Sequence, residues 1–344
     1  MLLGAGASAC FGLPVQANLL KQARKAAGAT VWGDRLKYLE RYAPFGTDVE
    51  EILTTIEIAN ANRDNATLLY EDAPWLDWNT IVAYITTPLL LKRSRLQRGL
   101  AIYCRFLQLL QRAYVTFISL NYDLYLEAAL VEFGWRPDYA FPFDLLRDFP
   151  VEDSAKLVTV LKPHGSLNWG FCWTCCTLHC SGLVEHPALR ADVDMWPTML
   201  DGWRWSGETS MVNLPECVTG PGEHVVRVPL VVPSRLKPTS LAPTDTLGRR
   251  TNAAVAAADA LVFVGCSLRE ADVDLRYFLT SALRKNAGIP VPVFCFAGPD
   301  TRNNIRRFLG PRAKFYKGVG PALPLYLDET GIDQFEEWCG RVLI

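Results

Sequence analysis

The chain has 344 residues, of which 35 are basic and 36 are acidic, giving a formal net charge of −1. A chain of this length can bury about three quarters of its extended surface, as one large domain or about two small ones. The balanced charge gives no indication of a nucleic-acid or polyanion partner. No apolar run reaches the roughly 18 residues that a membrane-spanning helix requires.

The ten cysteines raise the question of disulfide bonds. Met1-Leu2-Leu3 leads directly into a glycine-rich loop, so we expect no secretory leader. Reduced cysteines in a cytoplasmic protein are then expected, either as core residues or as metal ligands.

Short apolar runs predict the buried strands of one sheet. In chain order the predicted strands are Met1–Leu3, Tyr114–Leu120, Leu157–Leu161, Ala260–Val264, Val291–Gly298 and Lys314–Lys317. Between them the sequence predicts helices, at Asp123 to about Phe133, Asp272–Lys285 and Thr301–Leu309. Strands that alternate with helices in this way predict an α/β fold with a doubly wound, Rossmann-like parallel sheet.

Two segments interrupt this alternation. From Pro14 to about Arg112 the pattern is helical, with helices expected at Asp34–Tyr42, Thr47–Ala61 and from Pro88 onward. From Trp169 onward the chain is rich in cysteine, proline and glycine and has poor periodicity, which indicates a loop-rich module that needs a staple. We therefore expect a single domain over residues 1–344. Its parts are a core (1–20, 113–168 and 225–344), a helical insertion (21–112) and a cysteine-rich module (169–224).

Four short peptides follow four of the predicted strands. They are Gly4-Ala5-Gly6-Ala7-Ser8, Asn121-Tyr122-Asp123, His164-Gly165-Ser166 and Gly265-Cys266-Ser267-Leu268. Open α/β sheets bind ligands at the carboxyl ends of their strands, so these peptides predict one shared ligand site. A glycine loop alone is often only a tight turn. The other three peptides favour a phosphate-binding loop whose amides point at an anion.

The polar residues of these peptides also have structural interpretations. Asn121 and Asp123 stand where a strand meets a helix, so either can be a helix cap. His164 lies between Pro163 and Gly165 on a stiff turn, and a lone histidine is often a hydrogen-bonded structural residue. Because imidazole titrates near neutrality, His164 can also serve as a general base. Tyr122 and Cys266 are expected to be buried packing residues.

The set GAGAS, NYD, KPHGS and GCSL resembles the motifs of the sirtuin-like superfamily, which consumes NAD. More closely, the set resembles the bacterial branch whose members hydrolyse NAD in antiphage defence. The resemblance implies catalytic roles for Asn121 and His164, and contact of Asp123 with the nicotinamide ribose. It further implies cofactor contacts from Gly4, Ala5, Gly6 and Ser8 around the pyrophosphate, and from Gly265 and Ser267 on the adenosine half.

The activity that this resemblance implies is hydrolysis of NAD to nicotinamide and ADP-ribose. One alternative is an NAD-dependent protein deacylase. It is disfavoured because Phe11–Asn18 lacks the Asp-Phe-Arg continuation of that branch and Val228–Lys237 lacks its Phe-Gly-Glu strand. The other alternative is a non-catalytic module that senses NAD or ADP-ribose. The presence of both Asn121 and His164 disfavours it.

The cysteine-rich module contains one C-x-x-C pair, Cys172 and Cys175, at the point where sirtuin-like proteins often insert a zinc ribbon. A complete ribbon needs a second such pair some 15–20 residues further on. This chain offers Cys180 and Cys217, together with three histidines, to complete four ligands. Structural zinc and reduced, metal-free cysteines therefore both remain open.

A defence-type NAD hydrolase must be silent until it is triggered, so we expect a homo-oligomer or a partner subunit to control it. The final segment, Asp328–Ile344, predicts an amphipathic helix. The apolar residues of one face are Phe335, Trp338, Cys339 and Val342. This face either covers the core of its own domain or meets another chain.

The zinc hypothesis predicts about one equivalent of metal in the purified protein. Cys175→Ser should then lower the thermal stability of the protein without a comparable loss of NAD affinity, because a closed thiolate site holds structure and does no chemistry. Metal analysis and thermal unfolding measure both quantities. A metal-free protein whose stability is unchanged by Cys175→Ser would show that the cysteines are only core residues.

Overall fold

The structure is a computed structural model that describes residues 1–27, 54, 87–89, 93–141, 144–145, 151–152, 154–172, 178–180, 226–227, 242–268, 272–285, 289–316 and 327–342. The predicted helices at Asp34–Tyr42 and Thr47–Ala61 (apart from Thr54), the segment Val228–Lys237 and most of the cysteine-rich module lie outside these residues. The proposed division of the chain into core, insertion and module therefore stays a prediction.

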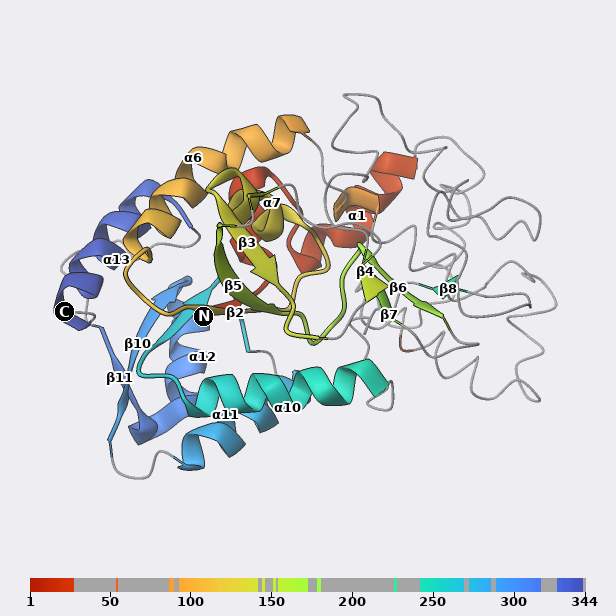
Figure 1. Ribbon diagram of the computed structural model, residues 1–344. Coiled ribbons are helices and arrows are strands. Elements are labelled where there is room, and N and C mark those ends of the chain that lie inside the picture. Colours follow the sequence, from red (N-terminus) through yellow and green to blue (C-terminus); the bar gives the residue numbers. More distant parts are fainter. Residues whose placement is uncertain are drawn as a thin grey trace, which may run out of the picture.

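A seven-stranded parallel sheet forms the centre of the described structure (Figure 1). Its strand order is β11-β10-β9-β1-β2-β5-β3, and every neighbouring pair is parallel. The strands are β1 (Leu2–Leu3), β2 (Thr116–Ser119), β3 (Trp135–Asp138), β5 (Lys156–Leu161), β9 (Leu261–Val264), β10 (Val291–Phe296) and β11 (Ala313–Phe315). β9, β10 and β11 follow one another outward on one side of β1, and β2, β5 and β3 lie on the other side, so the sheet is doubly wound. The predicted fold class is confirmed.

The inner strands are apolar on both faces because helices cover both sides of the sheet. Both residues of β1 and all four residues of β9 are buried. Parallel sheets that are covered on both faces require such continuous apolar runs, and this is why the runs could be found in the sequence.

The edge strand β3 was missed by the sequence analysis. Its sequence, Trp-Arg-Pro-Asp, includes Pro137, which has no N–H to donate. Among the described strands β3 pairs with β5 alone, so it lies at the edge of the sheet, where a proline is tolerated. The tertiary pairing with β5, and not the local sequence, makes this segment a strand.

Helices form a layer on each face of the sheet (Figure 1). On one face lie α6 (Arg93–Leu109), α7 (Tyr125–Glu132) and α13 (Glu329–Val342), and on the other lie α10 (Ala242–Ala256), α11 (Val273–Lys285) and α12 (Pro299–Leu309). The remaining helical elements are η1 (Ala5–Phe11), α1 (Gln16–Ala27), η3 (Thr87–Leu89) and η4 (Gly310–Arg312). Within the described part of the chain, no helix is both long enough and apolar enough to cross a membrane.

The C-terminal helix α13 docks on the sheet through an aromatic cluster. Phe335 lies 5.3 Å from Phe106 of α6 and 5.4 Å from Phe296 of β10, measured between ring centroids. Phe335 and Trp338 are buried, and their rings stack 5.5 Å apart. The predicted amphipathic helix is therefore confirmed, and its apolar face covers the core of its own chain.

A second, smaller sheet has the strand order β4-β7-β6-β8. Its strands are β4 (Asp144–Leu145), β6 (Trp169–Cys172), β7 (Leu178–Cys180) and β8 (Val226–Arg227). β6 pairs antiparallel with β7, so that Trp169 stands opposite Cys180. The start of the cysteine-rich module is thus paired β-structure, which the poor periodicity of this loop-rich segment did not predict. Trp169, Leu178 and Cys180 are all buried, and this burial supplies the order that the local sequence does not.

The two glycine loops after β1 and β9 pack backbone against backbone. The N–H of Gly4 donates to the carbonyl of Val264 (3.0 Å), and the N–H of Gly6 donates to that of Gly265 (3.1 Å). A Cβ at Gly4 would lie 2.6 Å from the Gly265 oxygen, and a Cβ at Gly265 would overlap the backbone of Gly6. Gly265 also has a φ of 57°, a conformation that disfavours side chains. Neither position therefore accepts a larger residue.

Gly265→Ala is expected to lower the free energy of unfolding by about 3 kcal/mol or more, because it adds backbone overlap to left-handed strain. The matched control is Gly134→Ala, since Gly134 has a φ of 82° but open space around its Cβ position. That control should lose only about 1–2 kcal/mol, from the strain alone. Urea unfolding of the two variants measures the difference. Equal losses would show that the loops do not interlock as described.

Candidate functional site

The structure brings the four sequence motifs to one edge of the sheet. Leu3 at the end of β1 is in register with Ser119 of β2 and with Val264 of β9. Both glycine loops and the Asn121 peptide therefore leave neighbouring strands together. Ile118 of β2 pairs with Leu161 of β5, and Asn121 and His164 each follow that pair by three residues. Strand register alone thus places the two predicted catalytic residues on the same edge.

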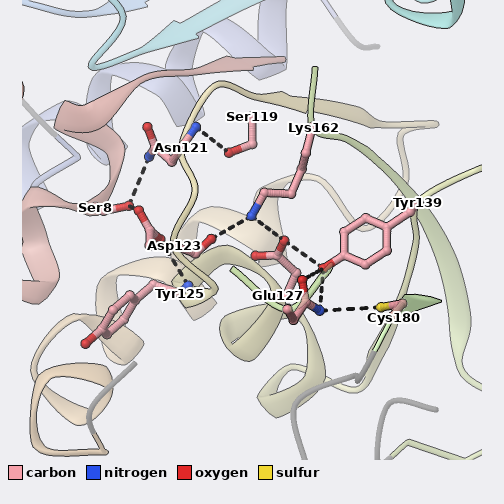
Figure 2. A network of polar contacts seen from close by, with 10 residues as sticks. Ser8, Ser119, Asn121, Asp123, Tyr125, Glu127, Tyr139, Lys162 and Cys180 are labelled. Atoms are coloured by element: carbon pink, nitrogen blue, oxygen red, sulfur yellow. Dashed lines mark hydrogen bonds and ion pairs between the residues drawn. The ribbon is translucent and has the colours of Figure 1, made fainter. Parts of the chain in front are cut away.

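Asn121 ties the end of β2 to the first glycine loop. Its side-chain nitrogen Nδ2 donates to the carbonyl of Gly4 (2.9 Å) and to Oγ of Ser8 (3.1 Å). Because a carbonyl can only accept, the amide nitrogen must face Gly4, and Oδ1 must face the other way. Figure 2 shows the same nitrogen pointing to Ser8 and Oδ1 pointing away. The helix α7 begins only at Tyr125, with Leu124 as its cap. Asn121 is therefore not a helix cap.

Ser8 connects Asn121 to Asp123. The Ser8 hydroxyl accepts from Asn121 Nδ2 and donates to Oδ2 of Asp123 at 2.9 Å (Figure 2). Ser8 is only 3% exposed. The resemblance implied a direct contact between Ser8 and the pyrophosphate. In the structure its hydroxyl joins the glycine loop to the Asn-Tyr-Asp peptide, and contact with the pyrophosphate stays a prediction.

Asp123 is buried and accepts two hydrogen bonds, from Ser8 Oγ and from the N–H of Tyr125 (3.1 Å). Burial raises the pKa of its carboxyl from 3.8 to about 6, while the Lys162 cation and the two hydrogen bonds oppose the rise. The bond to Tyr125 spans two residues, so Asp123 also organises the turn before α7. Asp123 therefore shapes the turn before α7 and also belongs to a polar cluster, which consists of Asn121, Ser8 and Asp123. Tyr122 is buried, as predicted.

His164 lies on the turn that follows β5. The turn is closed by a hydrogen bond from the N–H of Gly165 to the carbonyl of Lys162 (2.9 Å), and Gly165 has a φ of 87°. One step further, the N–H of Leu167 donates to the carbonyl of Tyr122 (3.0 Å). The His164 peptide and the Asn121 peptide are therefore joined through their backbones. The side chain of His164 is half-buried.

The sequence predicts that the amides of the first glycine loop point at an anion. Three of these amides instead donate to carbonyls of the protein. The N–H groups of Gly4 and Gly6 bond to the second loop, and that of Ala7 bonds to the carbonyl of Gly4 (2.8 Å). The bonds of Gly4 and Gly6 arise because the two loops meet, and the bond of Ala7 arises because η1 begins at Ala5 with Gly4 as its N-cap. Ala5 is the first residue of η1 and is half-buried.

In the second glycine loop, Cys266 is buried, as predicted, and burial raises the pKa of its thiol to about 12. Ser267 is half-buried beside it. Leu268 adopts a φ of 46°, which is unusual for a residue other than glycine. The unusual φ of Leu268 and the burial of Cys266 are consistent with close packing of this loop against the first glycine loop. Contact of Ser267 with a nucleotide stays a prediction.

The predicted metal ligands are largely beyond what the structure describes. Cys175, Cys217 and the side chain of Cys172 lie outside the described residues. Cys180 is buried, and its sulfur accepts from Nδ2 of Asn168 at 3.5 Å. Among the described residues, no three His, Cys, Asp or Glu side chains gather as metal ligands. Zinc therefore stays a prediction.

Sequence reasoning missed a buried ion pair, Lys162 with Glu127, which contacts the polar cluster at Asp123. Nζ of Lys162 lies 2.9 Å from Oε1 of Glu127, and both side chains are fully buried. Nζ also donates to the backbone carbonyl of Asp123 at 2.6 Å. Two signals in the sequence point to the pair. Lys162 opens the KPHGS motif, and Glu127 stands one helical turn after Asp123.

These residues define an α/β protein with a doubly wound parallel sheet and a polar cluster at its switch point, where such folds bind ligands. No protein-family model matches the chain, and no curated protein matches it.

The solved structures that are similar to the chain include several sirtuins. A sirtuin from a study of substrate affinity has 13% identity and a TM-score of 0.40, over 99% of this chain and 91% of that chain. A mutant Sir2 homologue in complex with ADP-ribose has 14% identity and a TM-score of 0.42, with the same coverage of each chain. Sir2 bound to acetylated peptide has 12% identity and a TM-score of 0.39, over 99% and 90%. At these values the similarities assign neither ligand nor activity.

The raised pKa of Asp123 makes a prediction about stability. Between its ordinary pKa of 3.8 and its folded value of about 6, the folded protein binds more protons than the unfolded chain. The stability contributed by this carboxyl is therefore complete below about pH 4 and is lost as the pH rises through about 6. Asp123→Asn should gain stability relative to the wild type over this window, by roughly 3 kcal/mol at most. Urea unfolding at several pH values tests this, and a difference that does not change with pH would contradict it.

Proposed function

We propose that the protein is an NAD glycohydrolase that cleaves NAD to nicotinamide and ADP-ribose. The observation that carries the proposal is the hydrogen-bonded chain from Asn121 through Ser8 to Asp123. It fixes an amide and a carboxyl at the carboxyl edge of the sheet, next to the His164 turn. Nucleotides bind at this edge in doubly wound folds. The resemblance of the four motifs to sirtuin-like NAD hydrolases supports the same ligand.

The chemistry needs few groups. The bond between C1′ of the ribose and the nicotinamide nitrogen breaks, and its electron pair leaves with nicotinamide, which departs neutral and needs no acid. A water oxygen then bonds to C1′, and its proton passes to a base. His164 is the proposed base. Asn121 has Oδ1 turned away from Gly4, so this oxygen can accept a hydrogen bond from the water or from a ribose hydroxyl.

The proposed cofactor contacts follow the same resemblance. Gly4, Ala5 and Gly6 would lie against the pyrophosphate, and Gly265 and Ser267 against the adenosine half. Ser8 would lie beside the pyrophosphate as well, while its hydroxyl bonds to Asn121 and Asp123.

The biological role is a further part of the proposal. By the resemblance, the protein acts in the cytoplasm as a toxic effector of bacterial antiphage defence. Uncontrolled loss of NAD would kill the cell, so activity must depend on self-assembly or on a partner subunit. The apolar face of α13 is not the contact, because Phe335 and Trp338 are buried in their own chain.

Asn121→Ala and His164→Ala are each expected to lower the rate of NAD cleavage while the fold is retained. Loss of a general base costs about 10²- to 10⁴-fold in rate. The measurement is release of nicotinamide and ADP-ribose by the purified protein, followed by chromatography. Asn303→Ala is the matched control, because Asn303 is an exposed asparagine on α12.

Each outcome of this assay decides between the alternatives. Full activity in either variant would refute the mechanism. Turnover of NAD only when an acyl-lysine peptide is present would identify a deacylase. Binding of ADP-ribose without any release of nicotinamide by the wild type would identify a non-catalytic sensing module.

A further inference from the structure

Burying the ion pair of Lys162 and Glu127 costs free energy of folding, because both charges are removed from water. Both side chains have 0% exposure, and removing two charges from water costs several kcal/mol for each ion. Oε2 of Glu127 is buried and has no hydrogen-bond partner among the described residues. An apolar pair of similar volume would often be at least as stable here. Stability therefore does not explain why the pair is charged.

The position of Lys162 offers an explanation. Its ammonium donates to the carbonyl of Asp123, which lies just outside helix α7, since the first helical bond runs from Ala128 N–H to Leu124 (2.9 Å). The backbone of Lys162 in turn closes the His164 turn. One residue thus holds the Asn121 peptide with its side chain (Figure 2). It holds the His164 peptide with its main chain.

Glu127 fixes the direction of the lysine side chain. Its Oε1 receives hydrogen bonds from Nζ of Lys162 (2.9 Å) and from the hydroxyl of Tyr139 (3.1 Å). Nδ2 of Asn168 donates to the same hydroxyl at 3.1 Å and to the sulfur of Cys180 at 3.5 Å. The network therefore runs from α7 to β7 of the second sheet. An apolar pair could fill this space but could not set the distance between the two peptides.

We propose that Lys162 and Glu127 are positioning residues that hold the Asn121 peptide and the His164 turn in fixed register, through the bond from Lys162 Nζ to the Asp123 carbonyl. Neither residue meets the substrate. The catalytic consequence rests on the proposed function, whereas the coupling of the two peptides does not. For that reason the two are tested separately.

The test uses the full chain with the double variant Lys162→Met/Glu127→Met, which keeps the side-chain volume and removes both charges. Each single variant leaves the other charge buried and unpaired, so it risks unfolding. The double variant is expected to keep the melting temperature within a few degrees of the wild type. The matched control is Lys314→Met, because Lys314 is an exposed lysine on β11 of the same sheet.

The first measurement is hydrogen exchange without any ligand. The Leu167 amide, which donates to the Tyr122 carbonyl, should exchange at least about tenfold faster in the double variant. The amides of the β1–β9 ladder should be unchanged, as should all amides in Lys314→Met. Unchanged protection of Leu167 in a folded double variant would overturn the proposal, whatever the protein's activity.

The second measurement is steady-state NAD cleavage. The double variant should lose about 10- to 100-fold in kcat, because misplacement of reacting groups by about 1 Å costs this much, while KM changes less than threefold. Wild-type kcat in the double variant would overturn the positioning role. If the wild type itself does not cleave NAD, the proposed function fails, and the exchange experiment still decides whether the pair couples the two peptides.

Discussion

Backbone contact between the two glycine loops is the constraint on which the site depends. Gly4 and Gly265 approach so closely that neither position has space for a Cβ. This contact joins β1 to β9 at the switch point of the sheet and starts η1 immediately after β1. The early start of η1 in turn places Ser8 where it meets Asn121 and Asp123. The polar cluster is therefore a consequence of how two loops without side chains pack.

Next to this cluster the protein buries the charged side chains of Lys162 and Glu127, in a place where apolar side chains could also pack. Lys162, Glu127 and Asp123 lie together in the interior, and two of them are acids. Burial raises the pKa of Asp123, while the nearby lysine holds it down. Well-packed apolar side chains would avoid the cost of burying these charges. They would not, however, supply a directed hydrogen-bond donor to the Asp123 carbonyl, as Lys162 does. Directed hydrogen bonds give fixed distances, and a reactive site needs fixed distances more than it needs stability.

The remainder of the described core is conventional by comparison. Aromatic side chains of α6, β10 and α13 pack against one another, and α13 is held by Phe335 and Trp338. This packing leaves the carboxyl edge of the sheet as the part of the core where polar groups gather. The second sheet joins that edge through Asn168 and Cys180, so part of the cysteine-rich module is linked to the polar network.

The sequence by itself determined the parallel sheet and the four motifs. A doubly covered strand must be apolar along its whole length, and such runs are visible locally, as in Ala260–Val264. Three things were decided only by the tertiary structure. β3 exists because β5 pairs with Pro137 and its neighbours. The N–H groups of Gly4 and Gly6 donate to the carbonyls of Val264 and Gly265 because two distant loops meet. Lys162 and Glu127 pair across 35 residues of chain. Each of these depends on a long-range contact, and a local pattern of residues carries no record of which distant partner will satisfy a donor, an acceptor or a charge.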